Sequence, residues 1–203
     1  TIGDGKPVID ISENVTINGK ITNSSGTINV WSNFNVDGVI TSTQTESIEH
    51  NVLNIGDETH VANVQVNNEI LYQTINVSSG SLTISSGRDG GAIIRNSSMT
   101  ITADGSLIAW SADAINTVDD EIRSDGQITF EDGVNKNNIV GTGTLIITGE
   151  VTNGTPEGET VSIAPTILQS TVSISGTFSN SSGTITTNYL TGEGSLVNND
   201  KLV

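Results

Sequence analysis

The sequence contains an internal repeat, and this repeat constrains the fold more than any other feature. Residues 15–40, VTINGKITNSSGTINVWSNFNVDGVI, align without a gap with residues 172–197, VSISGTFSNSSGTITTNYLTGEGSLV. A shorter copy, LIITGEVTN, occupies residues 145–153. Self-similar units are typical of solenoids, in which each unit buries its apolar side only by stacking on its neighbours.

Each copy reads as a short strand, a glycine corner, a second strand and a turn that bears asparagine. Apolar residues alternate with polar ones on both sides of the glycine, which is the period of a strand with one buried face. Glycine allows the positive φ of a sharp corner, and asparagine is typical of turns. The residues that define the repeat are Ile17, Gly19, Asn23, Gly26 and Ile28 in the first copy, Ile147, Gly149 and Asn153 in the short copy, and Ile174, Gly176, Asn180, Gly183 and Ile185 in the last.

Composition limits the thickness of the core. Only 33% of the 203 residues are hydrophobic and 3% are aromatic, so few large side chains are present to fill a wide interior. The sequence therefore predicts an all-β protein, a single parallel β-solenoid domain over residues 1–203. Tandem β-sandwich domains are the alternative architecture. The stretch around 42–72 departs from the repeat and is expected to be a less regular insertion.

The charge of the chain argues against several classes of partner. Asp and Glu number 23 against 7 Lys and Arg, which gives a formal net charge of -16. Phosphate backbones and anionic lipid surfaces should be repelled, so we expect no nucleic-acid partner. No apolar run approaches the roughly 20 residues of a membrane helix, and no membrane insertion is expected. The absence of cysteine rules out a disulfide framework.

Several of the repeated units resemble a known family. GKITNSSGTI at 19–28, GTLIITGEVTNGT at 143–155 and GSLVNND at 194–200 are similar to units in the β-helical passenger regions of bacterial autotransporter and two-partner-secretion adhesins. The resemblance extends over most of the chain. It implies a right-handed parallel β-helix that is exported, lies on the bacterial cell surface or is secreted, and belongs to a longer protein. Host or matrix glycans and proteins would be its partners.

Aromatic residues are scarce, and three of them are candidate ligand-binding residues: Trp31, Trp110 and Tyr72. An aromatic ring combines a large apolar face with polar edges, and exposed rings can stack on sugars. The position equivalent to Trp31 in the last repeat is Asn188, so the coil itself does not require a tryptophan there. The structural alternative is that Trp31 caps the edge of a coil.

Acidic residues concentrate in the stretch DDEIRSD at 119–125. Asp119, Asp120 and Asp125 are candidate metal ligands, and calcium in a structural role is the only cofactor considered, because calcium prefers oxygen ligands. Together with Arg123, these acids could also supply acid/base chemistry of the kind used by polysaccharide lyases. Surface ion pairing explains Arg123 equally well. With seven basic residues a groove for acidic sugars is hard to assemble, and we expect no enzyme.

A second group of polar residues comprises Glu46, Glu49, His50, Asp57, Glu58 and His60. Carboxylates beside imidazoles can bind a divalent metal or transfer protons. The spacing matches no H-E-x-x-H motif, and a solvated loop is the preferred interpretation.

The hypotheses for function fall into three classes. The leading one is an extracellular structural and adhesive module, a stiff stalk that mediates attachment. The alternative is a self-assembling subunit of an extracellular filament, whose open coil ends associate. The third is a polysaccharide lyase-like protein, which would depend on the 119–125 stretch.

Overall fold

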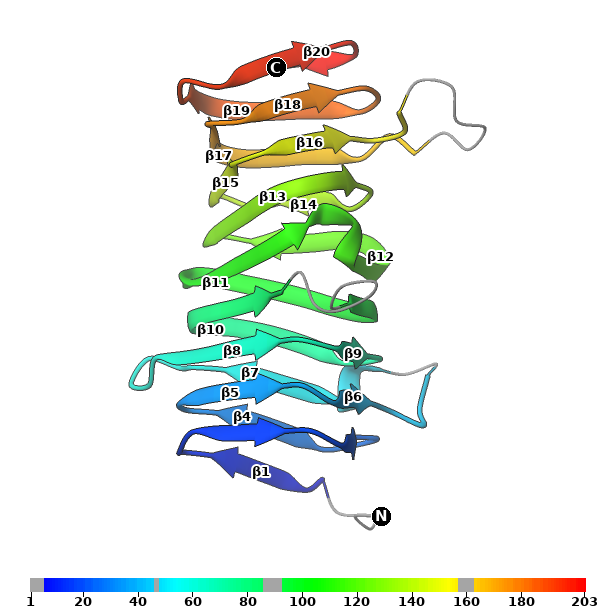
Figure 1. Cartoon of the computed structure of the whole chain (residues 1–203), viewed down its shortest axis with the longest axis vertical. Helices are drawn as coiled ribbons and strands as arrows, with labels where there is room; N and C mark the ends of the chain where they lie inside the picture. Colours follow the sequence, from blue (N-terminus) through cyan, green and yellow to red (C-terminus); the bar gives the residue numbers. More distant parts are fainter. Residues whose placement is uncertain (1–5, 46–47, 86–92, 157–162) are drawn as a thin grey trace.

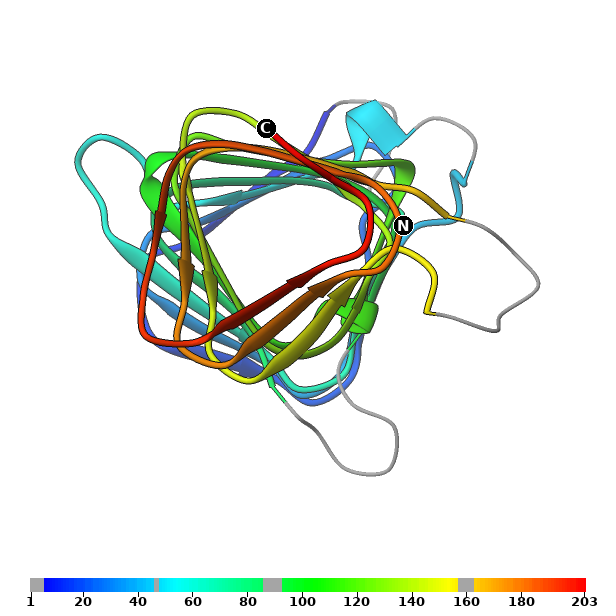
Figure 2. The same ribbon diagram turned by 90° about the horizontal axis from the view of Figure 1, so that it is seen from above.

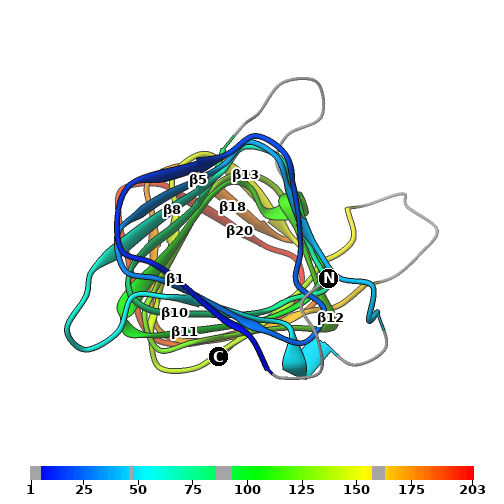
Figure 3. The same cartoon turned by 90° about the horizontal axis from the view of Figure 1, so that it is seen from below.

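The chain winds into a right-handed parallel β-solenoid of about nine turns in the computed structural model. The structure describes residues 6–45, 48–85, 93–156 and 163–203. Figure 1 shows the coils stacked from the N-terminal to the C-terminal end, and Figures 2 and 3 show a roughly triangular cross-section. Every strand pair is parallel. The predicted fold class is confirmed, and parallel pairing throughout excludes tandem sandwiches.

Three parallel sheets, here called faces 1, 2 and 3, form the walls. Face 1 contains β1 (Val8–Ile11), β4 (Thr27–Val30), β7 (Val52–Ile55), β14 (Asn138–Val140), β21 (Lys201–Leu202) and parts of β10 (Thr74–Ile84), β11 (Ile93–Ser111), β12 (Ile115–Ser124), β17 (Thr166–Ile174) and β19 (Thr184–Thr191). Face 2 contains β2 (Val15–Ile17), β5 (Asn33–Val36), β8 (Ala62–Val66), β15 (Thr144–Ile147) and parts of β10, β11, β13 (Gln127–Asn135), β17 and β19. Face 3 contains β3 (Lys20–Thr22), β6 (Val39–Thr41), β9 (Glu69–Leu71), β16 (Glu150–Asn153), β18 (Thr177–Asn180), β20 (Ser195–Asn198) and parts of β11, β12 and β13. Two short 3₁₀ turns, η1 (Ile48–His50) and η2 (Ala112–Ala114), complete the described elements.

Inward-facing side chains stack into columns along the solenoid. One column of face 2 consists of Val15, Phe34, Val64, Leu82, Leu107, Ile128, Leu145, Val172 and Leu190. Its inner members are buried, whereas Leu190 in the last coil is 45% exposed. Each fully buried aliphatic side chain contributes on the order of 1.5–3 kcal/mol. The columns therefore make each coil depend on the next one.

The predicted repeat is confirmed in three dimensions, because equivalent residues occupy the same faces. Val15–Ile17 and Val172–Ile174 both lie on face 2, and Ile28 and Ile185 both lie on face 1. The isoleucines of the repeat are buried except Ile17, which lies in the first coil and is only partly covered.

The positions of the repeat that carry glycine require it for different physical reasons. Gly183, in the turn that bears asparagine, has a φ of +125°, which L side chains rarely adopt. The positive φ predicted for the glycine between the two strands of each copy is absent at Gly19 and Gly149. Gly176 does not have a positive φ. Instead, a Cβ at this position would lie 2.1 Å from the carbonyl oxygen of Gly149. Close approach of successive backbones, and not a left-handed conformation, thus accounts for glycine at Gly176.

Buried asparagines form a ladder at the corner between faces 3 and 1. The Nδ2 of Asn135 donates to the Oδ1 of Asn153 at 2.8 Å, and Asn153 donates in turn to Asn180 at 2.9 Å. Asn180 donates to Asn198 at 2.8 Å, where the ladder reaches the surface. Asn153 and Asn180 are fully buried. Because a buried amide must be hydrogen-bonded, this ladder is satisfied only when the coils keep this register.

The N-terminal half of the same corner uses related contacts. The backbone N–H of Gly26 donates to the Oδ1 of Asn23 at 3.1 Å, and the Nδ2 of Asn23 donates to the Oε1 of buried Gln73 at 2.9 Å. The asparagines predicted as turn residues therefore point into the solenoid and hydrogen-bond across coils.

The stretch around 42–72, predicted as a less regular insertion, contains three strands in full register with their neighbours. These strands are β7, β8 and β9. The longer connections lie between β6 and β7 and between β7 and β8. Both connections lengthen the same coil: 30 residues separate Phe34 from Val64, whereas 18 separate Val172 from Leu190.

We expect Asn153→Ala to destabilise the solenoid by about 1–3 kcal/mol for each buried group that it leaves unpaired. The groups concerned are the donor amide of Asn135 and the acceptor oxygen of Asn180. Urea unfolding measures the loss, and amide hydrogen exchange localises it to the neighbouring coils. Asn198→Ala, at the exposed end of the ladder, is the control and should cost about 0.5–1.5 kcal/mol. Equal losses for the two variants would contradict the role of the ladder.

Candidate functional site

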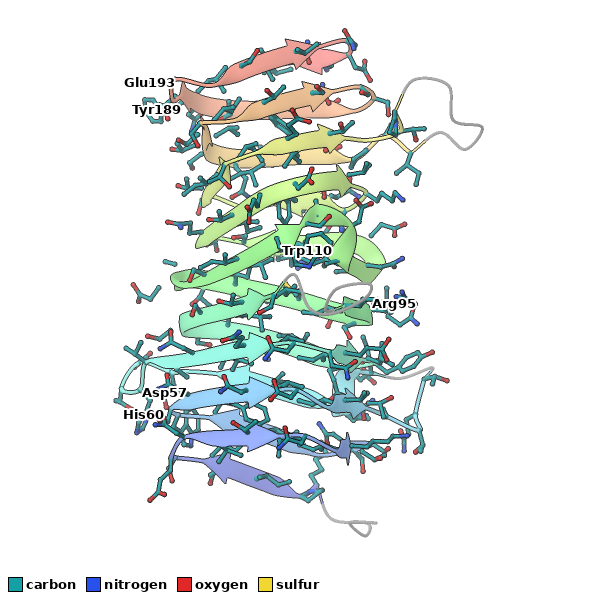
Figure 4. All side chains as sticks on the ribbon, viewed as in Figure 1. Asp57, His60, Arg95, Trp110, Tyr189 and Glu193 are labelled. Atoms are coloured by element: carbon teal, nitrogen blue, oxygen red, sulfur yellow. The ribbon has the colours of Figure 1, made fainter. Side chains whose placement is uncertain are left out.

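Trp110 lies between two hollows at the corner that joins face 2 to face 3. It follows inward-facing Ala109 at the end of β11, so its indole points outward and packs partly against the core. Figure 4 shows it on the front of the stack, midway along the solenoid. Its Nε1 is buried without a hydrogen-bond partner. The ring therefore acts here as an apolar wall.

Carboxylates from successive coils line these hollows. The first, of about 360 Å³, is bounded by Trp110, Glu131, Asp132 and Glu150. The second, of about 420 Å³, is bounded by Trp110, Arg95, Asp113 and Asp132, among others. The Nζ of Lys136 lies 3.7 Å from Asp113, so part of this charge is paired. An aromatic wall with hydrogen-bond acceptors around it suits a ligand that combines apolar faces with hydroxyl or amine donors.

Trp31 lies at the opposite margin of face 2, where face 1 turns into it. Its ring centroid is 5.2 Å from that of His60, with the planes inclined by 35°. His60 belongs to the connection between β7 and β8, and its Nδ1 lies 2.9 Å from the Oδ1 of Asp57. Figure 4 shows Asp57 and His60 together at the edge near the N-terminal end. Trp31 thus packs against this loop, a contact that agrees with the alternative in which it caps the edge of a coil, and its role in ligand binding stays a prediction.

Asp57 organises the loop that carries His60. Its Oδ1 accepts from the backbone N–H of Thr59 at 2.8 Å, from the Thr59 hydroxyl at 2.9 Å and from the backbone N–H of His60 at 2.7 Å. These bonds, that of the Thr59 N–H above all, lower the pKa of Asp57 from 3.8 to about 2. Neither Glu49 nor His50 joins this cluster, since they belong to η1, where they lie 3.5 Å from each other. Glu46 of this polar group lies outside the described residues, and the contacts of Asp57 and His60 agree with the solvated-loop interpretation.

Tyr72 lies away from both tryptophans, at the corner between faces 3 and 1. It has a φ of +57°, and its carbonyl oxygen accepts bonds from the side-chain amides of Asn51 and Gln73. Its backbone thus belongs to the polar corner. Tyr189, in contrast, is 66% exposed on face 2 near the C-terminal end.

The predicted acidic stretch lies along the outside of β12 and the corner that follows it. Glu121 pairs with Arg123 at 2.7 Å, and Asp125 accepts from the backbone N–H and the hydroxyl of Thr142 at 2.9 and 2.8 Å. The bond from the Thr142 N–H, first of all, lowers the pKa of Asp125. These groups border an open hollow of about 390 Å³. Asp125 therefore caps the next coil through Thr142.

Asp120 has a φ of +49° within β12. Asp119 belongs to the same strand, but its side chain lies outside the described part of the structure. Among the side chains that are described, no three acidic or histidine residues gather as a metal site would require. The calcium site stays a prediction. The described part of the chain likewise contains no helix long and apolar enough to cross a membrane.

Comparison with known proteins gave no relative. No family model, no curated protein and no solved structure matches this chain.

The pH dependence of the Asp57 loop follows from the lowered pKa. A carboxylate whose pKa is lower when folded stabilises the protein above pH 4, and this contribution is lost as the pH falls toward 2. We expect Asp57→Ala to lower the thermal midpoint at pH 6, with the difference from the wild type shrinking between pH 4 and pH 2. Thr59→Val, which keeps the backbone donor, should retain part of the effect. A difference independent of pH would contradict this assignment.

Proposed function

We propose that this chain is a stiff structural and adhesive module of a bacterial surface protein, which holds a binding surface away from the cell and attaches it to host or matrix. The observation that carries the proposal is the unbroken stack of about nine coils, joined by parallel ladders on three faces and by apolar columns inside. Such a stack resists bending, because deformation must break backbone bonds and core contacts together.

The exterior supports an extracellular role for the same module. A net charge of -16 keeps copies apart in solution, and cysteine is absent from the sequence. The repeated units resemble those of exported β-helical adhesins. We place the protein on the bacterial surface or in the secreted fraction on these grounds, with host or matrix glycans and proteins as partners and with no nucleic acid among them. No enzymatic activity forms part of the proposal.

The hollows beside Trp110 are the proposed contact for the attached ligand. We expect Trp110→Ala to weaken retention on immobilised matrix glycans and proteins at least tenfold, because the apolar wall of both hollows is removed. Trp110→Phe is the matched control. It keeps a smaller aromatic face and loses an N–H that has no partner, so binding should change less than threefold. If Trp110→Ala binds like the wild type while circular dichroism is unchanged, Trp110 is not the contact.

A filament subunit is the second candidate, because both terminal coils expose apolar side chains and unpaired strand edges. Val8 and Ile9 are 59% and 42% exposed at one end, and Leu190 and Leu202 are 45% and 44% exposed at the other. A second copy could add its first coil to the last coil of another.

Light scattering after size-exclusion chromatography, over a range of concentrations, separates the two candidates. Elongated monomers at every concentration support the adhesive module. Fibres that grow with concentration and are abolished by Leu202→Asp would favour the filament. Thr100→Asp, which adds the same charge at an exposed position on face 1 in the middle of the stack, is the control for that variant.

A further inference from the structure

Between its two corners, face 2 of the solenoid carries no charged residue; Asp104 in β11 and Asp132 in β13, which continue its ladders, lie at the corners. Its outward side chains form two rows, made up of Asn33, Asn63, Ser81, Ser106, Gln127, Thr144, Thr171 and Tyr189 in one and of Thr16, Asn35, Gln65, Thr83, Ile108, Thr129, Ile146, Ser173 and Thr191 in the other. Faces 1 and 3 do carry charges in their strands, for example Asp10 and Arg123 on face 1 and Glu69 and Arg95 on face 3. In a chain of net charge -16 this difference marks face 2 as a distinct surface.

Acidic residues border face 2 on both sides. The corner from face 1 carries Glu13, Asp57, Glu58, Asp104 and Asp125, and the corner toward face 3 carries Asp37, Asp113, Glu131, Asp132 and Glu193. A polyanion laid on the face would be repelled by both borders. A second copy of this chain, packed with its own face 2, would bring acidic borders against each other at the same cost. Both kinds of partner are therefore disfavoured.

The C-terminal half of face 2 offers hydrogen-bonding groups that are free to bind a ligand. In the N-terminal half the side chains bond to one another: Asn63 donates to Asn33 at 3.2 Å, and Ser81 donates to Asn63 at 2.8 Å. In the C-terminal half, no side-chain hydrogen bond within the described structure engages Thr144, Thr171 or Ser173. These hydroxyls repeat along the axis at the strand spacing of about 4.8 Å.

Apolar and aromatic groups accompany these hydroxyls. Ile108 is 40% exposed and Tyr189 is 66% exposed on the face itself. Trp110 lies at its margin, next to the hollow that Glu131 and Glu150 line. Hydroxyl rows with interspersed apolar patches match a chain of sugar rings, which present C–H faces and hydroxyl edges in alternation.

We propose that the C-terminal half of face 2, from β11 to β19, binds an uncharged polysaccharide laid along the solenoid axis, with Trp110 at its margin and Tyr189 on the face as stacking residues. The carboxylates of the borders then accept hydrogen bonds from sugar hydroxyls at the two sides of the chain. This inference rests on the proposed adhesive function and specifies its ligand class.

The test introduces charge of either sign on the face. Ser173→Glu and Ser173→Lys place it in the centre of the free hydroxyls, and Thr186→Glu and Thr186→Lys place it at a similarly half-buried outward position on face 1, one coil further on. The probes are cellulose, dextran and galactomannan as neutral chains, polygalacturonate as an anionic chain, chitosan as a cationic chain, and immobilised matrix proteins. Circular dichroism checks that all four variants fold.

We expect the wild type to bind at least one neutral chain. Both Ser173 variants should weaken that binding tenfold or more, because the ligand would cover an unpaired charge whichever its sign. Both Thr186 variants should remain within twofold of the wild type. This pattern supports the inference.

Other outcomes overturn it in distinguishable ways. Binding to polygalacturonate that rises with Ser173→Lys, or to chitosan that rises with Ser173→Glu, would assign the face to a charged ligand. Binding to matrix proteins alone would overturn the inference and leave the adhesive function standing, whereas retention on no probe would overturn both. A wild-type dimer that Ser173→Glu converts to monomer would make face 2 a contact between copies.

Discussion

Parallel hydrogen bonding between successive coils is the interaction on which the rest of this structure depends. A coil has no partner for most of its peptide groups except the coils above and below it, and buried peptide groups must be paired. Once three short strands in each turn are held in this way, their inward side chains fall into columns. The apolar interior of Phe34, Ile128 and Val172 is then a consequence of backbone register. Neither the backbone hydrogen bonds between coils nor the apolar interior is stable without the other.

The asparagine ladder fixes the register between neighbouring coils, which the aliphatic columns alone leave free to shift. Aliphatic columns tolerate a shift of one coil against its neighbour, since one β-branched residue fills much the same space as another. A buried amide does not, because each shift leaves a donor and an acceptor unpaired. The bonds that join Asn135, Asn153 and Asn180 inside the corner therefore select one register. At the corner between faces 2 and 3, glycine at position 176 likewise allows successive coils to approach closely. A Cβ there would collide with the backbone of Gly149.

The exterior follows from the same geometry. Acidic residues gather at the corners, where turns favour Asp and where the chain is most exposed to water. The flat strands between the corners receive Thr, Ser, Asn and Gln, which suit a pleated surface open to solvent on one side. On face 2 the acidic residues lie only at the corners, and a neutral surface runs between these two acidic borders. A stalk with such a face can present one long, shallow contact, in contrast to an enclosed pocket.

Alternation, the recurrence of Ile28 at Ile185, and the match of Asn23 to Asn180 were enough to predict, from the residues alone, a stacked parallel fold with asparagine at one corner. The sequence also singled out Trp110 as one of three candidate ligand-binding aromatic residues. Which residues surround that tryptophan emerges only from the folded chain. Glu131 and Glu150 lie one and two coils further on, and coil length varies from 18 to 30 residues between the positions compared above. The neutral surface of face 2 could not be predicted from the sequence for the same reason. Neighbours in a solenoid are set by stacking across coils, and loops of unequal length remove that periodicity from the linear sequence.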